Sequence, residues 1–153
     1  MKKKILVIGA SGLFGLNFVQ RNHDKYKIIC NIHQKSIKKN EFQKVKINFK
    51  NKKNLYQNIK NIRPDIILNA AGFTDVKKCE LNKKDANFTN FEILKPLIKI
   101  ANKLKIKIIQ ISSDHIFDGS KIGLYKETDK VKPINHYANT KVKAEKEIKK
   151  SCN

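Results

Sequence analysis

Several residue types are scarce in this 153-residue sequence, and each scarcity excludes a class of fold or site. Cysteine occurs only at Cys30, Cys79 and Cys152, an odd number without a C-x-x-C pair, so neither a cysteine redox motif nor a metal site is expected. This usage favours a reducing, cytoplasmic environment. No apolar run approaches the ~20 residues that span a bilayer, which predicts a soluble protein without a membrane partner. The length suits one domain with one core.

Arginine is also scarce, because Arg21 and Arg63 are the only two and lysine supplies nearly all of the formal charge of +21. Such a charge would ordinarily suggest nucleic acid or an anionic surface as the partner. The lysines are spread through the chain, however, and no aromatic residues interleave with them as a base-stacking platform requires. We therefore favour solvated lysine faces and do not expect a nucleic acid partner.

Short apolar runs alternate with longer amphipathic ones, which predicts an α/β fold: a doubly wound parallel sheet of the Rossmann type. The predicted strands are Lys4–Ile8, Lys27–Ile32, Lys44–Asn48, Asp65–Asn69 and Lys107–Ser112. The predicted helices are Leu13–Asn22, Lys52–Asn61, Lys84–Leu104 and Asn135–Lys150. Pro96 lies inside the third helix, where it would kink or divide it. Ligands of such sheets bind at the carboxyl ends of the strands.

A glycine pattern, Gly9-x-x-Gly12-x-x-Gly15, follows the first predicted strand and opens the first helix. A turn of this kind lets a pyrophosphate approach bare backbone and places it at a helix N-terminus. The pattern also explains the glycines that interrupt the apolar stretch of Met1–Phe18, which a signal peptide would not. An ordinary tight turn is the alternative interpretation, and the position between strand and helix argues against it.

The end of the second strand should indicate the cofactor, because an acid there would bind the ribose 2'-hydroxyl of NAD. No acid occurs from Ile28 to Asn40, whereas His33 and Lys35 are available. This composition favours NADP, with NAD as the alternative.

Tyr137 and Lys141 are four residues apart on a predicted helix, so the phenol and the ammonium share one face. An adjacent cation favours phenolate and lowers the pKa of a tyrosine, which can then serve as a general acid or base. Ser113 follows the last predicted strand and could hold a substrate oxygen beside the tyrosine. The histidines show no metal-ligand spacing, so no metal is expected.

Together these residues resemble the extended short-chain dehydrogenase/reductases, and more narrowly the dTDP-4-dehydrorhamnose reductase branch. The segments that carry the narrower resemblance are Pro64–Glu80, Ile111–Gly119, Tyr125–Glu127 and Pro133–Glu145. The resemblance implies reduction of the 4-keto group of a nucleotide-activated deoxysugar, as in the last step of dTDP-L-rhamnose synthesis for cell-surface polysaccharide. A related nucleotide-sugar epimerase or dehydratase is the alternative.

The resemblance also implies roles for single residues. Tyr137 would protonate the carbonyl oxygen, Lys141 would hold the nicotinamide ribose, and Ser113 would orient the carbonyl. The positions expected to bind the cofactor are Gly9, Ser11, Gly12, Leu13, Phe14, Gly15, His33, Lys35, Asn48, Phe49, Asn69, Ala70, Ala71, Tyr137 and Lys141. Asn90 would bond to backbone, and His115 stands where a tyrosine is common.

Members of the branch continue for about as long again after the position of Asn153, and that part grips the nucleotide and the sugar. We therefore expect one truncated dinucleotide-binding domain, residues 1–153, without the substrate lobe. Three interpretations stay open: a fragment of a longer reading frame, a chain completed by a second polypeptide, and a remnant with weakened activity. A homodimer also stays open as a partner. A non-catalytic nucleotide-binding module is the alternative to an enzyme.

Overall fold

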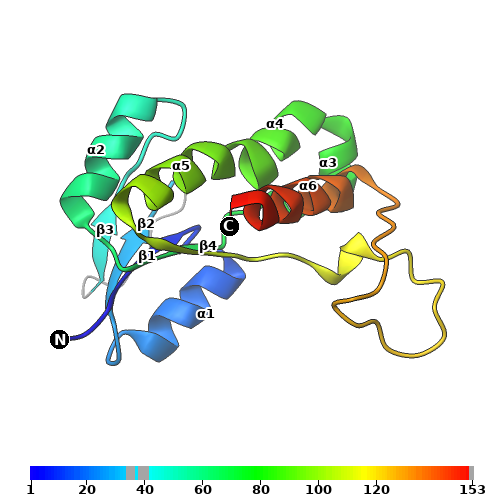
Figure 1. The fold of residues 1–153 in the computed structure, drawn as a ribbon, viewed down its shortest axis with the longest axis horizontal. Helices are drawn as coiled ribbons and strands as arrows, with labels where there is room; N and C mark the ends of the chain where they lie inside the picture. Colours follow the sequence, from blue (N-terminus) through cyan, green and yellow to red (C-terminus); the bar gives the residue numbers. More distant parts are fainter. Residues whose placement is uncertain (34–36, 38–41, 152–153) are drawn as a thin grey trace. The chain divides into compact units, whose positions relative to one another are not determined.

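The structure is a computed structural model that describes residues 1–33, 37 and 42–151 (Figure 1). Its contacts divide the chain into two compact units. Unit 1 comprises Met1–Ala71 and Pro96–Ile111, and unit 2 comprises Gly72–Lys95 and Ser112–Asn153.

Unit 1 is built on a five-stranded sheet in the order β3-β2-β1-β4-β5, and every neighbouring pair is parallel. The strands are β1 (Lys4–Ile8), β2 (Lys27–Asn31), β3 (Gln43–Val45), β4 (Ile66–Asn69) and β5 (Lys107–Gln110). The central strand β1 is apolar and buried from Ile5 to Ile8 because helices cover both faces of the sheet. The predicted parallel sheet is therefore confirmed.

Helices cover the two faces of this sheet separately, as Figure 1 shows. On one face α1 (Leu13–Asn22) packs Val19 against Val7 and Cys30. On the other face α2 (Lys52–Ile62) and α5 (Leu94–Leu104) contribute Leu55, Ile59 and Leu97 to a second apolar cluster. Two cores on opposite faces of one sheet define the doubly wound arrangement that the sequence predicts.

Three of the strands end earlier than the sequence patterns predict. β2 ends at Asn31 and β5 at Gln110, although Ile32 and Ile111 each still donate one backbone hydrogen bond to the neighbouring strand. β3 is limited to Gln43–Val45, whereas the prediction runs to Asn48. The apolar pattern extends past each ladder because the residues that leave the sheet still pack against its core.

Unit 2 consists of short helical segments around one long helix. They are α3 (Val76–Leu81), α4 (Lys83–Asn87), the π-helical turn η1 (Phe88–Glu92), the 3-10 turn η2 (Asp114–Ile116) and α6 (His136–Ser151). All four shorter segments pack against α6. Their small apolar cluster holds Cys79, Ala86 and Tyr137, so the chemically interesting tyrosine is also a core residue of this unit.

The helix predicted over Lys84–Leu104, with a kink or division at Pro96, is divided, and the division lies a few residues before the proline. That stretch comprises most of α4, then η1, and then α5, with a wide turn in which Ile93 N donates to Phe88 O. Pro96 is the third residue of α5, where a backbone N–H needs no partner within the helix. The wide turn lies on the amino side of Pro96. In a regular α-helix the proline ring would clash with the carbonyl four residues earlier, and the wide turn avoids that clash.

The sequence patterns also missed α3. It begins after Asp75, whose carboxylate caps the helix by accepting a 2.9 Å hydrogen bond from Lys78 N. A six-residue helix is too short to show the apolar periodicity on which prediction depends. In the part of the chain that the structure describes, no helix is long and apolar enough to cross a membrane.

Candidate active site

The turn between β1 and α1 requires glycine at position 9. Gly9 has φ 79°, in the left-handed region, and a Cβ there would lie 2.6 Å from Ala71 N. Any side chain would be strained and would also overlap the backbone that follows β4. The turn therefore brings two stretches of bare backbone together at the carboxyl edge of the sheet.

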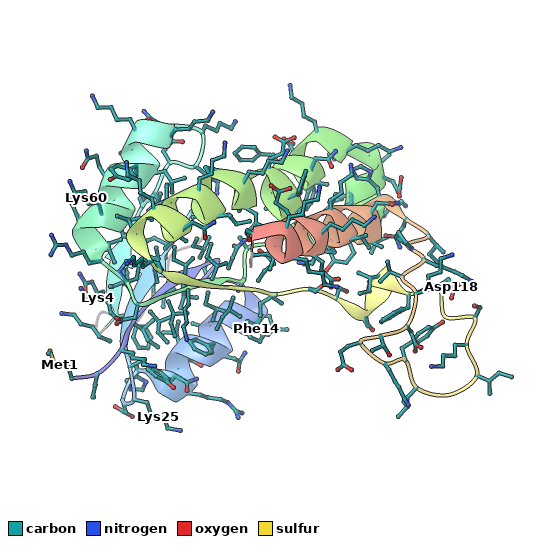
Figure 2. All side chains as sticks on the ribbon, in the orientation of Figure 1. Met1, Lys4, Phe14, Lys25, Lys60 and Asp118 are labelled. Carbon is teal, nitrogen blue, oxygen red and sulfur yellow. The ribbon has the colours of Figure 1, made fainter. Side chains whose placement is uncertain are left out.

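The other two glycines shape the start of α1. A Cβ on Gly15 would overlap the Gly9 carbonyl oxygen, so glycine is needed for the helix to pack against the turn. No side chain caps α1 at Gly12 in the described structure, which leaves the first-turn amides to solvent or a ligand. Leu13 and Phe14 are 86% and 49% exposed at this helix end, where Figure 2 labels Phe14. Ser11 is half-buried.

Asn69 closes the end of β4. Its Nδ2 donates to Gln110 Oε1 over 2.7 Å, and its Oδ1 accepts from Ala71 N over 3.3 Å. Ala70 N donates to Ile8 O over 2.9 Å. The buried asparagine thus fixes the backbone of Ala70 and Ala71 beside Gly9, while its own side-chain groups are used within the protein.

The residues around β2 and β3, which include expected cofactor positions, differ in their surroundings. Asn31 is buried, and its side chain donates to Val45 O over 3.4 Å. His33 is exposed, while Lys35 lies outside the described residues. Asn48 is exposed and accepts from Lys50 N over 3.0 Å, and Phe49 packs partly buried against the cluster beneath α2.

In unit 2, α6 places Tyr137 and Lys141 one turn apart, and both are buried, at 7% and 4% exposure. Lys141 is the one buried charged residue of the described chain. Burial lowers the pKa of its ammonium, and the charge of Glu145 opposes that shift. A lysine held in this way in a chain with many solvated lysines indicates a specific task.

Ser113 lies beside this helix within the same unit. It is the N-cap of η2, and its hydroxyl accepts from His115 N over 3.3 Å and donates to Asp114 Oδ1 over 3.2 Å. The His115 ring meets the Tyr137 ring edge-on, with centroids 5.6 Å apart. The structure therefore places Ser113 at the start of a turn, η2, that packs on the helix of Tyr137 and Lys141 within unit 2.

Asn90 joins η1 to this arrangement. Its Oδ1 accepts from Phe73 N over 2.7 Å, and its Nδ2 donates to Phe73 O and to Thr140 Oγ1 over 3.1 and 3.0 Å. Thr140 in turn donates to Tyr137 O over 2.6 Å. The expectation that Asn90 bonds to backbone is confirmed, and the bond to Thr140 adds a link to the turn of α6 between the tyrosine and the lysine.

A pocket of about 510 Å³ lies on the η2 side of unit 2. Its lining residues are Asp114, His115, Phe117, Asp118, Gly119 and Tyr125. The Phe117 and Tyr125 rings stack at 4.4 Å, and Asp118 accepts hydrogen bonds from Ser120 and from the Tyr125 hydroxyl. These bonds hold the pKa of the Asp118 carboxyl well below its usual range. The pocket offers aromatic faces and carboxylate acceptors, both of which suit a hydroxyl-bearing ligand.

Two polar contacts of this unit were missed by sequence reasoning. Ser112 Oγ donates to Glu145 Oε1 over 2.6 Å, and Thr140 mediates between Asn90 and Tyr137. The spacing of Tyr137, Lys141 and Glu145 at intervals of four places Glu145 on the face of the tyrosine and the lysine, but it does not indicate the contact with Ser112. The described residues hold no group of three His, Cys, Asp or Glu side chains that could bind a metal ion.

Known proteins of similar sequence and structure extend well beyond this chain. A dTDP-4-dehydrorhamnose reductase of Shigella flexneri is 35% identical over 104 residues, which cover 68% of this chain and 35% of that protein. The crystal structure of a hypothetical dTDP-4-dehydrorhamnose reductase of Sulfolobus tokodaii is 33% identical, with a TM-score of 0.85, over 94% of this chain and 51% of that one.

A second solved structure shares the fold at lower identity. The dTDP-4-dehydrorhamnose reductase of Bacillus anthracis, solved in complex with NADP, is 24% identical with a TM-score of 0.83 and covers 100% of this chain and 51% of that one. The chain thus spans between about a third and a half of the length of these relatives. The family model described as the RmlD substrate binding domain matches residues 2–153, nearly the whole chain. With its glycine turn and its buried tyrosine and lysine, this chain belongs to the RmlD substrate binding domain family.

Proposed function

We propose that this chain carries the cofactor-binding and proton-donating parts of an NADPH-dependent reductase that converts the 4-keto group of a nucleotide-activated deoxysugar to a hydroxyl. The observation that carries the proposal is the buried pair Tyr137 and Lys141 on one face of α6, with the Ser113 turn packed against the same helix. Membership of the family and the names of its relatives support the sugar nucleotide as the substrate class.

The glycine turn fits a dinucleotide. Gly9 leaves a backbone cradle that a Cβ would fill, and the uncapped start of α1 offers amides to a pyrophosphate. Gly9, Gly12, Gly15 and the Ala70–Ala71 backbone would hold the cofactor, with Leu13 and Phe14 beside it. A bound nicotinamide dinucleotide supplies the hydride for reduction of the carbonyl carbon.

NADPH is the proposed cofactor rather than NADH. The sequence from Ile28 to Asn40 has no acid that would select the ribose 2'-hydroxyl, and His33 is exposed where a 2'-phosphate would need a cation or a donor. NADP is also the ligand of the Bacillus anthracis structure, which shares the fold.

Three side chains of unit 2 would complete the reduction. The Tyr137 hydroxyl donates its proton to the carbonyl oxygen as that oxygen gains negative charge, so the tyrosine acts as the general acid. The Lys141 ammonium stabilises the phenolate that remains. The Ser113 hydroxyl, which donates to Asp114 in the structure, turns to donate to the substrate oxygen and orients the carbonyl.

Substitution of Tyr137 by Phe tests the proposal against a module that binds nucleotide without catalysis. We expect the 153-residue chain to bind NADPH and to oxidise it in the presence of dTDP-4-dehydrorhamnose. Tyr137→Phe should lower kcat by about 10²–10⁴-fold, because only the proton donor is lost. NADPH oxidation is followed by absorbance, and NADPH affinity by fluorescence titration.

The affinity measurement also serves as the control. Equal NADPH affinity in parent and variant, with turnover in the parent alone, supports the reductase. Equal affinity without turnover in either chain would instead identify a nucleotide-binding module. Substrates of related epimerases are tested with NAD⁺ by analysis of the sugar product, because an epimerisation returns its hydride and consumes no net NADPH. Epimerised product in the absence of NADPH-dependent reduction would assign the chain to a different reaction.

A further inference from the structure

One face of α6 carries three functional groups at intervals of four residues: Tyr137, Lys141 and Glu145. The first two are buried, whereas Glu145 is half-buried. The helix has one further acid, Glu147, which lies two residues later and therefore points away from that face. Glu145 is thus the acid of α6 that shares a face with the lysine.

The Glu145 carboxylate is anchored from outside the helix. Ser112 Oγ donates to Glu145 Oε1 over 2.6 Å, a short bond typical of a hydroxyl on a carboxylate. Ser112 is the residue before Ser113, the N-cap of η2. One carboxylate therefore ties the segment that holds the proposed carbonyl-orienting serine to the helix that holds the tyrosine and the lysine.

We propose that Glu145 is a positioning residue for Lys141: anchored by Ser112, its carboxylate is the counter-charge of the buried ammonium and holds it on the face of α6 that presents Tyr137. The catalytic consequence rests on the reductase function proposed above. The electrostatic consequence does not, because it concerns only the lysine and the glutamate.

The electrostatics of unit 2 support this role. A buried ammonium is costly without a compensating charge, and Glu145 is the group whose charge opposes the effect of burial on the Lys141 pKa. The elements packed on α6 bring other titratable groups to its amino-terminal end. Cys79 packs beside Tyr137, Glu80 accepts from His136 N, and the His115 ring, next to Asp114, contacts Tyr137.

Two substitutions separate the effect of the Glu145 charge from the effect of its hydrogen bond with Ser112. Glu145→Gln keeps an oxygen that can accept from Ser112 but removes the charge. Ser112→Ala keeps the charge but removes the donor that fixes it. Glu147→Gln is the matched control, since it removes one acid from the same helix on another face.

The test follows the Lys141 ammonium itself, in the full chain labelled with 15Nζ-lysine and titrated by NMR, with the resonance assigned by its loss in Lys141→Arg. We expect Glu145→Gln to lower the Lys141 pKa by about 0.5 or more, because an opposite charge nearby favours the charged form. Ser112→Ala should lower it less, and Glu147→Gln should leave it unchanged. In turnover assays, the alkaline limb of kcat should move to lower pH in Glu145→Gln.

An unchanged Lys141 pKa in folded Glu145→Gln would overturn the proposal. Should that variant not fold, Ser112→Ala decides in its place: a lowered Lys141 pKa supports the positioning role and an unchanged one overturns it. If the Lys141 pKa is lowered in Glu145→Gln but the parent chain shows no reductase turnover, the positioning role is supported and the proposed function is contradicted. The two failures are therefore distinguishable.

Discussion

Lys141 is the residue whose placement is hardest to explain by folding alone. It is 4% exposed, whereas the other lysines of the described residues are accessible or partly accessible, and its burial opposes the protonated form. A methionine of similar length would fill the same space without that cost. A cation retained in such a place is expected to serve chemistry rather than stability.

This reasoning gives a pH-dependent prediction for Lys141→Met. The folded-state pKa of Lys141 lies below its ordinary value, so the unfolded chain binds the proton more tightly, and the lysine destabilises the folded chain below that folded-state pKa. The penalty fades as pH rises through the folded-state value toward 10.5, the unfolded value. We expect Lys141→Met to raise Tm at pH 7 by about 2–4 °C and the difference to shrink toward alkaline pH.

Thermal unfolding of both chains from pH 7 to pH 10 checks the prediction. Lys146→Met, on an exposed position of the same helix, is the control and should change Tm little at any pH. A lower Tm in Lys141→Met at pH 7 would show that the ammonium stabilises the fold.

For single residues, the sequence predicts the candidate site residues that lie close together along the chain. Tyr137 and Lys141 are one helical turn apart, and Gly9, Gly12 and Gly15 mark a turn by their order alone. The contacts of Asn90 with Phe73 and Thr140, and of Ser112 with Glu145, join residues 17 to 50 positions apart. Such contacts depend on how segments pack, which no local pattern records.

Among the elements, the turn from β1 to α1 is the most constrained, and it yields a second prediction. Gly9→Ala should lower the free energy of unfolding by more than about 2 kcal/mol, because φ 79° is strained for alanine and the Cβ would overlap Ala71. NADPH affinity should fall at least about tenfold, since the same backbone is proposed to hold the pyrophosphate. Chemical denaturation and fluorescence titration measure the two effects.

Gly119→Ala separates the effect of backbone strain from the effect of the close approach between Gly9 and Ala71. Gly119 has φ 76°, close to that of Gly9, but a Cβ there would meet nothing within 4 Å. This control should cost only the backbone strain, about 1 kcal/mol, and should leave NADPH affinity unchanged. Equal losses of stability in the two variants would contradict the role assigned to close backbone approach.

The sequence predicts a helix or strand correctly where the surroundings of that helix or strand are the same along its whole length. β1 and α1 have the bounds that their patterns predict, because a strand buried on both faces and a helix over one core are uniform in surroundings. The stretch from Lys84 to Leu104 passes from unit 2 to unit 1, so its apolar residues serve two cores while the periodicity looks continuous. The π-helical turn at Phe88–Glu92 lies in that stretch, before the change of core.

For the whole molecule, the charge of +21 is distributed rather than concentrated. Figure 2 labels Lys4, Lys25 and Lys60, which come from β1, the turn after α1 and α2 of unit 1. In unit 2, Lys121 and Lys132 pair with Asp129 and Asp118. In the described residues this distribution agrees with solvated lysine faces.

The proposed transfer of hydride from NADPH to a sugar carbonyl is tested most directly with deuterium. The 153-residue chain is incubated with NADPH deuterated at C4 of the nicotinamide and with dTDP-4-dehydrorhamnose, and the sugar is examined by mass spectrometry and NMR. We expect deuterium at C4 of the product sugar with the parent chain and an about 10²–10⁴-fold slower incorporation with Tyr137→Phe. A folded parent chain that binds NADPH but leaves the sugar without deuterium would contradict the claim.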